Sequence, residues 1–100
     1  MDKERMDALP PDVARAARRV CARHGLDLRT LDYAALLAAK GSMAPEEYDA
    51  LGYVIRKPVT AEDIRREGLT WMEPEPPWQA REDAANARIL FKAMGLVRDE

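Results

Sequence analysis

Residues 30–41, Thr-Leu-Asp-Tyr-Ala-Ala-Leu-Leu-Ala-Ala-Lys-Gly, are the stretch that we expect to decide the fold. Asp32 is the only charged residue from Leu31 to Ala39, so a helix here is apolar on nearly every side. Such a helix is either buried in protein or placed in a membrane, and it is far shorter than the roughly 20 residues of a membrane span. We therefore predict that it forms the buried centre of a small helical domain, with Leu36 and Leu37 in the core.

The ends of this central helix are marked by residues that commonly begin and end helices. Thr30 can accept hydrogen bonds from the first free backbone N–H groups, and Asp32 complements the positive end of the helix dipole. Gly41 can adopt the left-handed conformation that stops a helix. The sequence thus predicts a helix bounded by Thr30 and Gly41.

The rest of the chain predicts further helices on both sides of this stretch. Val13, Ala16, Ala17, Val20 and Cys21 recur at three- and four-residue steps within a helix over about 11–24, which Gly25 ends. We also predict a short, frayed helix within 1–9, and helices over 44–51, 60–67 and 78–94. An extended strap with three prolines is expected over 69–77.

The expected architecture is a mainly α-helical single domain of 1–100, built as a small bundle of four to five helices. One hundred residues with 47% hydrophobic and 34% charged side chains suit one compact core. The β-branched pair Val54-Ile55 leaves open whether residues 53–55 continue a helix or form a short strand. Residues 69–72 are the other place where a minor short β element could form.

The composition also indicates which classes of partner and which cellular compartment to expect. The net charge of −2 gives no overall basic field for nucleic acid or an anionic membrane. A single cysteine excludes a disulfide framework and favours a reducing compartment, and the first six residues contain no apolar secretion signal. We expect a cytoplasmic protein that does not act on a membrane.

Cys21 and His24 are the only pair with the spacing of metal ligands. They lie one turn apart on a helix, but the chain holds no other cysteine or histidine to complete a zinc site. Both also fall on the apolar stripe, so we interpret Cys21 as a buried, inert thiol. Without a glycine-rich phosphate loop or a convincing nucleophile–base pair, we expect no enzyme, cofactor or metal.

A group of arginines is the main candidate for contact with nucleic acid or an acidic partner. The four lie opposite the apolar stripe of the helix over 11–24: Arg15, Arg18, Arg19 and Arg23. Helices 31–39 and 44–51 could also form a helix-turn-helix, the DNA-binding regulator that is our alternative function. Its recognition helix would begin Pro-Glu-Glu-Tyr-Asp at Pro45, and these carboxylates have the wrong charge for DNA.

The strap and the last helix carry the strongest indication of protein binding. Leu90, Phe91 and Met94 can complete the core, which leaves Trp78 and Ile89 on another side of the helix. We interpret these two, bordered by Arg81, as a partner surface. For Trp71 the alternatives are a partner contact and a cover over the end of the core, and we favour the cover.

These observations together predict a small protein-binding module, such as an adaptor, an assembly factor or an inhibitor. Its partner would be another protein or a second copy in a homodimer. Compact acidic inhibitors encoded by phages, including anti-CRISPR proteins, have this size and general composition, although no motif links the chain to them. The arginine-rich composition is typical of a bacterial or phage coding background.

Overall fold

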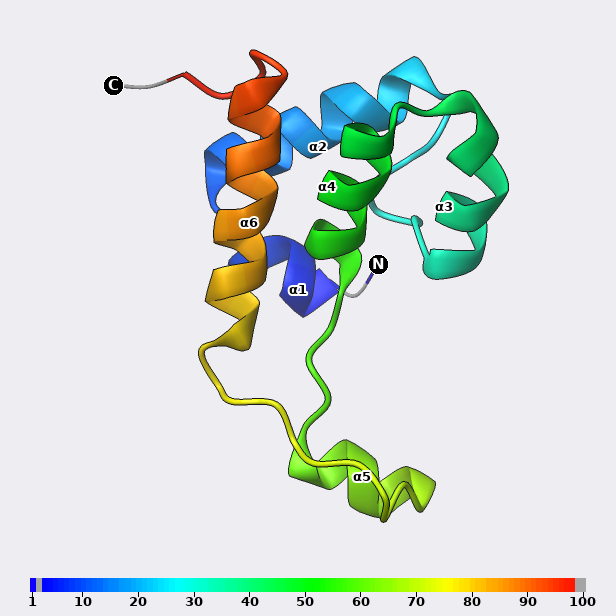
Figure 1. Ribbon diagram of the computed structural model, residues 1–100, viewed down its shortest axis with the longest axis vertical. Coiled ribbons are helices and arrows are strands. Elements are labelled where there is room, and N and C mark those ends of the chain that lie inside the picture. Colours follow the sequence, from blue (N-terminus) through cyan, green and yellow to red (C-terminus); the bar gives the residue numbers. More distant parts are fainter. Residues whose placement is uncertain (2, 99–100) are drawn as a thin grey trace.

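The computed structural model describes residues 1 and 3–98, and this part of the chain contains six α-helices and no strand (Figure 1). The predicted mainly α-helical fold is confirmed. The helices are α1 (Lys3–Ala8), α2 (Pro11–Arg23), α3 (Tyr33–Ala39), α4 (Pro45–Ile55), α5 (Ala61–Glu67) and α6 (Gln79–Ala93), with a short 3-10 turn (Lys40–Ser42) directly after α3.

Helices α4 and α6 form the centre of the molecule. Figure 1 shows them side by side, with α2 crossing behind one end of the pair, and their mutual packing is the most extensive of any two helices. Leu51 and Val54 of α4 and Phe91 of α6 are fully buried, and Phe91 is the largest side chain in the core. Burial of these apolar side chains is the main force that holds the helices together.

The prediction that the helix within 31–39 is the buried centre is wrong. Leu36 is completely buried, but the next residue, Leu37, is 56% exposed, and Tyr33 is also exposed. Helix α3 packs mainly against α4 and its own 3-10 turn, so only one side of it is covered. An apolar run allows burial on every side, but α3 is a seven-residue helix at the edge of the molecule, and α4 is the main helix that packs against it.

Both predicted ends of this helix also differ in the structure. Asp32, not Thr30, is the N-cap, and its Oδ1 accepts a 2.7 Å hydrogen bond from the N–H of Ala35. Thr30 lies in the preceding turn, where its hydroxyl donates to the carbonyl of Asp27. Gly41 sits within the 3-10 turn, and it is not among the glycines with positive φ. A tighter helical turn therefore ends α3 without a left-handed residue.

Helix α2 agrees with its predicted bounds and buried face. Val13, Ala17 and Val20 are fully buried, as their spacing indicates. Gly25 adopts the left-handed conformation at φ +69°, which ends the helix as predicted. Gly95 does the same at φ +75° after α6, directly beyond the helix predicted over 78–94.

Neither of the two short β elements that the sequence left open forms in the described residues. Helix α4 continues through Ile55, and the N–H of Arg56 still donates to the carbonyl of Gly52 at 3.1 Å. Over 69–72 the chain forms a turn, in which Met72 donates to the carbonyl of Leu69. Val54 gains more from burial against the core as part of α4 than it loses through its lower helix propensity.

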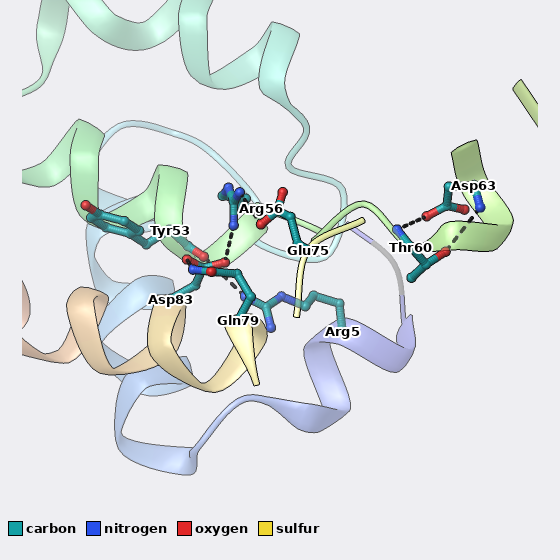
Figure 2. Close-up of polar contacts among 8 residues, drawn as sticks. All are labelled: Arg5, Tyr53, Arg56, Thr60, Asp63, Glu75, Gln79 and Asp83. Atoms are coloured by element: carbon teal, nitrogen blue, oxygen red, sulfur yellow. Dashed lines mark hydrogen bonds and ion pairs between the residues drawn. The ribbon is translucent and has the colours of Figure 1, made fainter. Parts of the chain in front are cut away.

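Residues 57–77 form a separate arm that includes α5. Figure 1 shows α5 well away from the other helices, and none of its residues is buried. Its ends agree with the sequence, because Thr60 and Asp63 bond reciprocally to each other's backbone N–H groups at 3.1 Å (Figure 2). Gly68 ends it at φ +69°. Local capping therefore supports α5 in place of a packed apolar face.

The N-terminal residues are tied to the body by helix α1. The predicted short helix forms over Lys3–Ala8, and Leu9 after it is buried in the core. Nη2 of Arg5 donates to the carbonyl of Tyr53 at 3.2 Å (Figure 2). That carbonyl belongs to the last turn of α4, where helices leave acceptors free. Arg5 thus caps α4 from a distance and joins α1 to the last turn of α4.

Candidate protein-binding surface on helix α6

One side of α6 carries large apolar side chains that the protein does not cover. Trp78, immediately before the helix, is 51% exposed, and Ile89 is 64% exposed. Arg81 and Ala85 between them are also exposed. At 100° per residue these four residues share one side, turned away from the buried face of Phe91. We call these four residues the α6 outer face. The predicted exposure of Trp78 and Ile89 is confirmed.

A groove runs along the border of this face, between α1 and α6. Its volume is about 300 Å³, near the lower end of the range for ligand sites. We call it the α1–α6 groove, and it is lined by small apolar side chains and three arginines: Arg5, Ala8, Pro10, Ala80, Arg81, Ala84, Ala85 and Arg88. Arg81 and Ala85 belong to both the groove and the α6 outer face.

The three guanidinium groups at the groove differ in how they are neutralised. Nε and Nη2 of Arg88 donate to the two carboxylate oxygens of Asp12 at 2.9 and 3.0 Å. These bonds lower the pKa of Asp12 and raise that of Arg88. Arg81 differs, because no carboxylate among residues 1 and 3–98 lies within salt-bridge distance of it. Arg81 therefore offers its positive charge to solvent or to a partner.

Arg5 is the third arginine of the groove, and only some of its guanidinium N–H groups have a hydrogen-bond partner. Burial lowers the pKa of Arg5, while the nearby Asp83 opposes that shift. Its Nη2 is engaged with Tyr53, but its buried Nε has no hydrogen-bond partner among the described residues. Leaving a buried donor unpaired is costly, so the position of α1 must be held by other contacts. Leu9 in the core provides one of them.

A polar cluster fixes the start of α6 and therefore the position of Trp78 and Arg81. Figure 2 shows Arg56, at the end of α4, pointing toward Asp83 of α6 and Glu75 of the arm. Nη1 of Arg56 lies 2.7 Å from Oδ2 of Asp83, and Nη2 bonds to Glu75. These two carboxylates raise the pKa of Arg56, so that it stays charged. The cluster thus joins α4, the arm and α6 at one point.

Trp71 does not cover the end of the core, so our interpretation of it is wrong. It is 78% exposed, which makes it the most exposed large apolar side chain of the described residues. It lies in the turn of the arm that follows α5, and it takes no part in the lining of the α1–α6 groove. The arm projects from the body, so the turn that carries Trp71 has no core beneath it.

The predicted arginine face of α2 is exposed, as expected from its position opposite the buried stripe. Arg15, Arg18, Arg19 and Arg23 all reach solvent. Nη1 of Arg23 lies 3.8 Å from Glu47, and no carboxylate among residues 1 and 3–98 lies within salt-bridge distance of the other three. The first turns of α4 expose Glu46 and Asp49, so the N-terminal end of the helix-turn-helix candidate presents negative charge.

The structure separates the environments of Cys21 and His24. Cys21 is buried, and desolvation, aided by the charge of Asp27, raises the pKa of its thiol to about 11. His24 instead faces Glu47, with its Nε2 3.1 Å from Oε2. A hydrogen bond from the backbone N–H of Ala44 lowers the pKa of Glu47, and His24 contributes further. Within the described residues, no three His, Cys, Asp or Glu side chains are placed to hold a metal ion.

Sequence reasoning missed two surfaces. The α1–α6 groove was missed because no pattern in residues 3–8 indicates that α1 lies beside α6. A second hollow of about 400 Å³ is lined in part by Tyr33, Tyr48 and Tyr53, and it was missed because α3 was assigned to the core. The exposure of Tyr33 could have been suspected from its polar hydroxyl, which favours the edge of a core.

Comparisons with known proteins add nothing to this description, because no protein-family model, curated protein or solved structure matches the chain. The described helices are also too short, or too polar, for any of them to cross a membrane. The function must therefore be argued from the surfaces of the chain itself.

Proposed function

We propose that this chain is a small cytoplasmic protein-binding module, an adaptor, assembly factor or inhibitor, and that the α6 outer face contacts its partner. The observation that carries the proposal is the exposure of Trp78 and Ile89 on the side of α6 that lies next to a groove. Tryptophan and arginine are the residue types most enriched among the contacts that dominate binding energy at protein interfaces. Both occur here, at Trp78 and Arg81.

The rest of α6 supports this assignment, because its buried side is already complete. Ala87 and Phe91 are fully buried, and Ala84 is nearly so. Trp78 and Ile89 therefore do not fill the core, and their exposure costs the free protein favourable apolar burial. A partner that covers both side chains would recover that free energy. The lone buried cysteine supports a reducing compartment such as the cytoplasm.

The test is a Trp78→Ala, Ile89→Asp double variant with a matched control on another surface. Leu37→Asp is the control, since Leu37 is similarly exposed but lies on α3. Tagged wild-type and variant proteins are used to capture partners from lysate of the native host, with mass spectrometry to identify them. Sedimentation equilibrium measures self-association of the same proteins. Affinity for the identified partner, or for a second copy, is then measured directly.

We expect the double variant to keep its helical circular-dichroism signal and most of its melting temperature. It should lose partner binding or self-association by at least about 2 kcal/mol, or roughly 30-fold in Kd, while Leu37→Asp keeps both. Unfolding of the double variant, together with a monomeric wild type that captures no partner, would assign Trp78 and Ile89 to stability. Equal loss in the Leu37→Asp control would also contradict the proposal.

The second candidate function is contact with nucleic acid through the arginine face of α2. Its support is the exposure of Arg15, Arg18 and Arg19 without a carboxylate partner within salt-bridge distance among the described residues. A gel-shift assay at low salt tests it, because binding through phosphates weakens steeply as salt concentration rises. A shift that an Arg15→Gln, Arg18→Gln, Arg19→Gln variant abolishes would favour this function. Absence of a shift at low salt would exclude it.

A further inference from the structure

We propose that the α1–α6 groove receives a helix of the partner protein that carries carboxylate side chains, with Arg81 as their anchor. This inference rests on the proposed function and names the chemistry of the partner. It deepens that function because the exposed Trp78 and Ile89 by themselves indicate only that the partner is apolar. The groove adds a charge requirement and a shape requirement.

The charge requirement follows from the three arginines of the groove. None of the described residues that line the groove is an aspartate or a glutamate. Asp12 neutralises Arg88, whereas neither Arg5 nor Arg81 has a carboxylate of the described residues within salt-bridge distance. Arg5 is partly buried and donates to the carbonyl of Tyr53, so Arg81 is the exposed guanidinium that is open to a partner. Arginine binds carboxylates with two parallel hydrogen bonds, which are stronger than bonds between neutral groups. A partner carboxylate at Arg81 would give it the kind of pairing that Arg88 already has with Asp12.

The shape requirement follows from the size of the other lining residues. Ala8, Ala80, Ala84 and Ala85 present only methyl groups, so another backbone can approach closely. The distance between packed helices depends on the side chains at the contact. From Trp78 to Ile89 the outer face extends over about three helical turns, or roughly 16 Å. A partner helix with apolar residues at i, i+4, i+7 and i+11 spans this length, whereas a single residue or small anion does not.

The experiment uses two synthetic amphipathic peptides of about 15 residues, long enough for partial helix formation. Both carry leucine along one face and alanine elsewhere. One has glutamate beside the leucines, and the other has glutamine at the same positions. Binding to the full chain is followed by NMR, using the backbone amides of α6 and the side-chain Nε–H signals of the arginines. The Arg81→Gln variant is compared with Arg65→Gln, a matched change at an exposed arginine of the arm.

We expect the glutamate peptide to shift the signals of Arg81 and Ala85, and to bind at least tenfold more tightly than the glutamine peptide. Arg81→Gln should remove that preference, and Arg65→Gln should retain it. The preference should also fall as salt concentration rises. With an identified partner, Arg81→Gln should weaken binding in the same way.

Three results would overturn the inference. The first is equal binding of the two peptides, and the second is binding that moves signals away from the groove. The third is that neither peptide binds. None of these results affects the proposed function, which fails separately if the Trp78→Ala, Ile89→Asp variant keeps its partner. If sedimentation shows that the partner is a second copy, loss of dimer in Arg81→Gln supports the inference, and an unchanged dimer contradicts it.

Discussion

Arg56 at the end of α4 and Asp83 in α6 form an ion pair of 2.7 Å, and the carboxylate of Asp83 is only 2% exposed. Gln79 adds a 3.1 Å hydrogen bond to the other carboxylate oxygen. A buried carboxylate is stable only when its charge is paired and its oxygens accept hydrogen bonds. This pair therefore connects the two central helices at the point where the arm leaves the body and returns.

We predict that Arg56→Met lowers the free energy of unfolding by about 2–3 kcal/mol, because Asp83 loses its charged partner while it stays buried. Methionine keeps much of the aliphatic stem, so lost packing contributes little. Chemical denaturation at neutral pH measures the effect. Adding Asp83→Asn to this variant should restore part of the stability, since a neutral amide is less costly to bury. A double variant no more stable than Arg56→Met alone would contradict the explanation.

The adjacent leucines of α3 provide a test of which side of that helix is covered. Leu36 is completely buried, so Leu36→Ala should cost about 2–5 kcal/mol. Leu37→Ala should change the free energy of unfolding by no more than about 0.5 kcal/mol, as expected for an exposed position. Both are measured from denaturation midpoints under identical conditions. Equal costs would show that α3 is buried on both sides.

We predict that Cys21 reacts slowly with thiol reagents in the native protein. We also predict that its ionisation lowers the free energy of unfolding at alkaline pH. The thiolate is the reactive form, and burial raises the pKa of this thiol to about 11. We expect labelling with a thiol reagent at pH 8 to be slow until denaturant opens the protein. Rapid stoichiometric labelling of the native chain would contradict this.

The sign of the pH effect follows from the same raised pKa. In the unfolded chain the thiol ionises near its ordinary pKa of 9.0, while the native protein holds the proton to about 11. Its contribution to stability is therefore fully present below pH 9 and is lost as the pH rises toward 11. Wild type must be compared with Cys21→Ala, so that the contribution of this thiol is separated from every other effect of alkaline pH. The variant should lose less stability between pH 9 and 11.

The ion pair between Asp12 and Arg88 should stabilise the fold at neutral pH and fail in acid. Arg88 lowers the pKa of Asp12 below its ordinary 3.8, so the contribution is present above that pH and is lost as the pH falls below it. Both side chains are about one third exposed, and solvent screening limits the contribution to about 1 kcal/mol or less. Arg88→Gln should show this loss at pH 7, and the difference from wild type should vanish in acid. Arg65→Gln is the control that should change little.

Helix bounds were predictable where the deciding residues lie within a few positions of each other. Thr60 and Asp63 cap α5 as their spacing indicates, and Gly25, Gly68 and Gly95 end their helices in the left-handed conformation. Where two residues compete for one local role, the sequence was insufficient. Thr30 and Asp32 can both cap a helix, and the geometry of the preceding turn selected Asp32.

Only the part of the candidate site that lies on a single helix, the α6 outer face, was predictable from the sequence. The spacing of Trp78, Ala85 and Ile89 places them on one side of α6 whatever α6 packs against. The groove beside them needs α1, and α1 is placed there with the help of Arg5, which caps a carbonyl 48 positions later in the chain. No periodicity within either helix contains that relationship.

The sequence by itself determined the helical class, most helix ends and the two sides of α2 and α6, because these depend on neighbours within about one or two turns. Only the tertiary structure decided that α4 is the centre and α3 the edge, that Trp71 is exposed, and that α1 and α6 enclose a groove. The physical reason is that an apolar residue gains the same free energy against any apolar neighbour. Leu36 and Leu37 are therefore equivalent in sequence, and only the position of α4 distinguishes them.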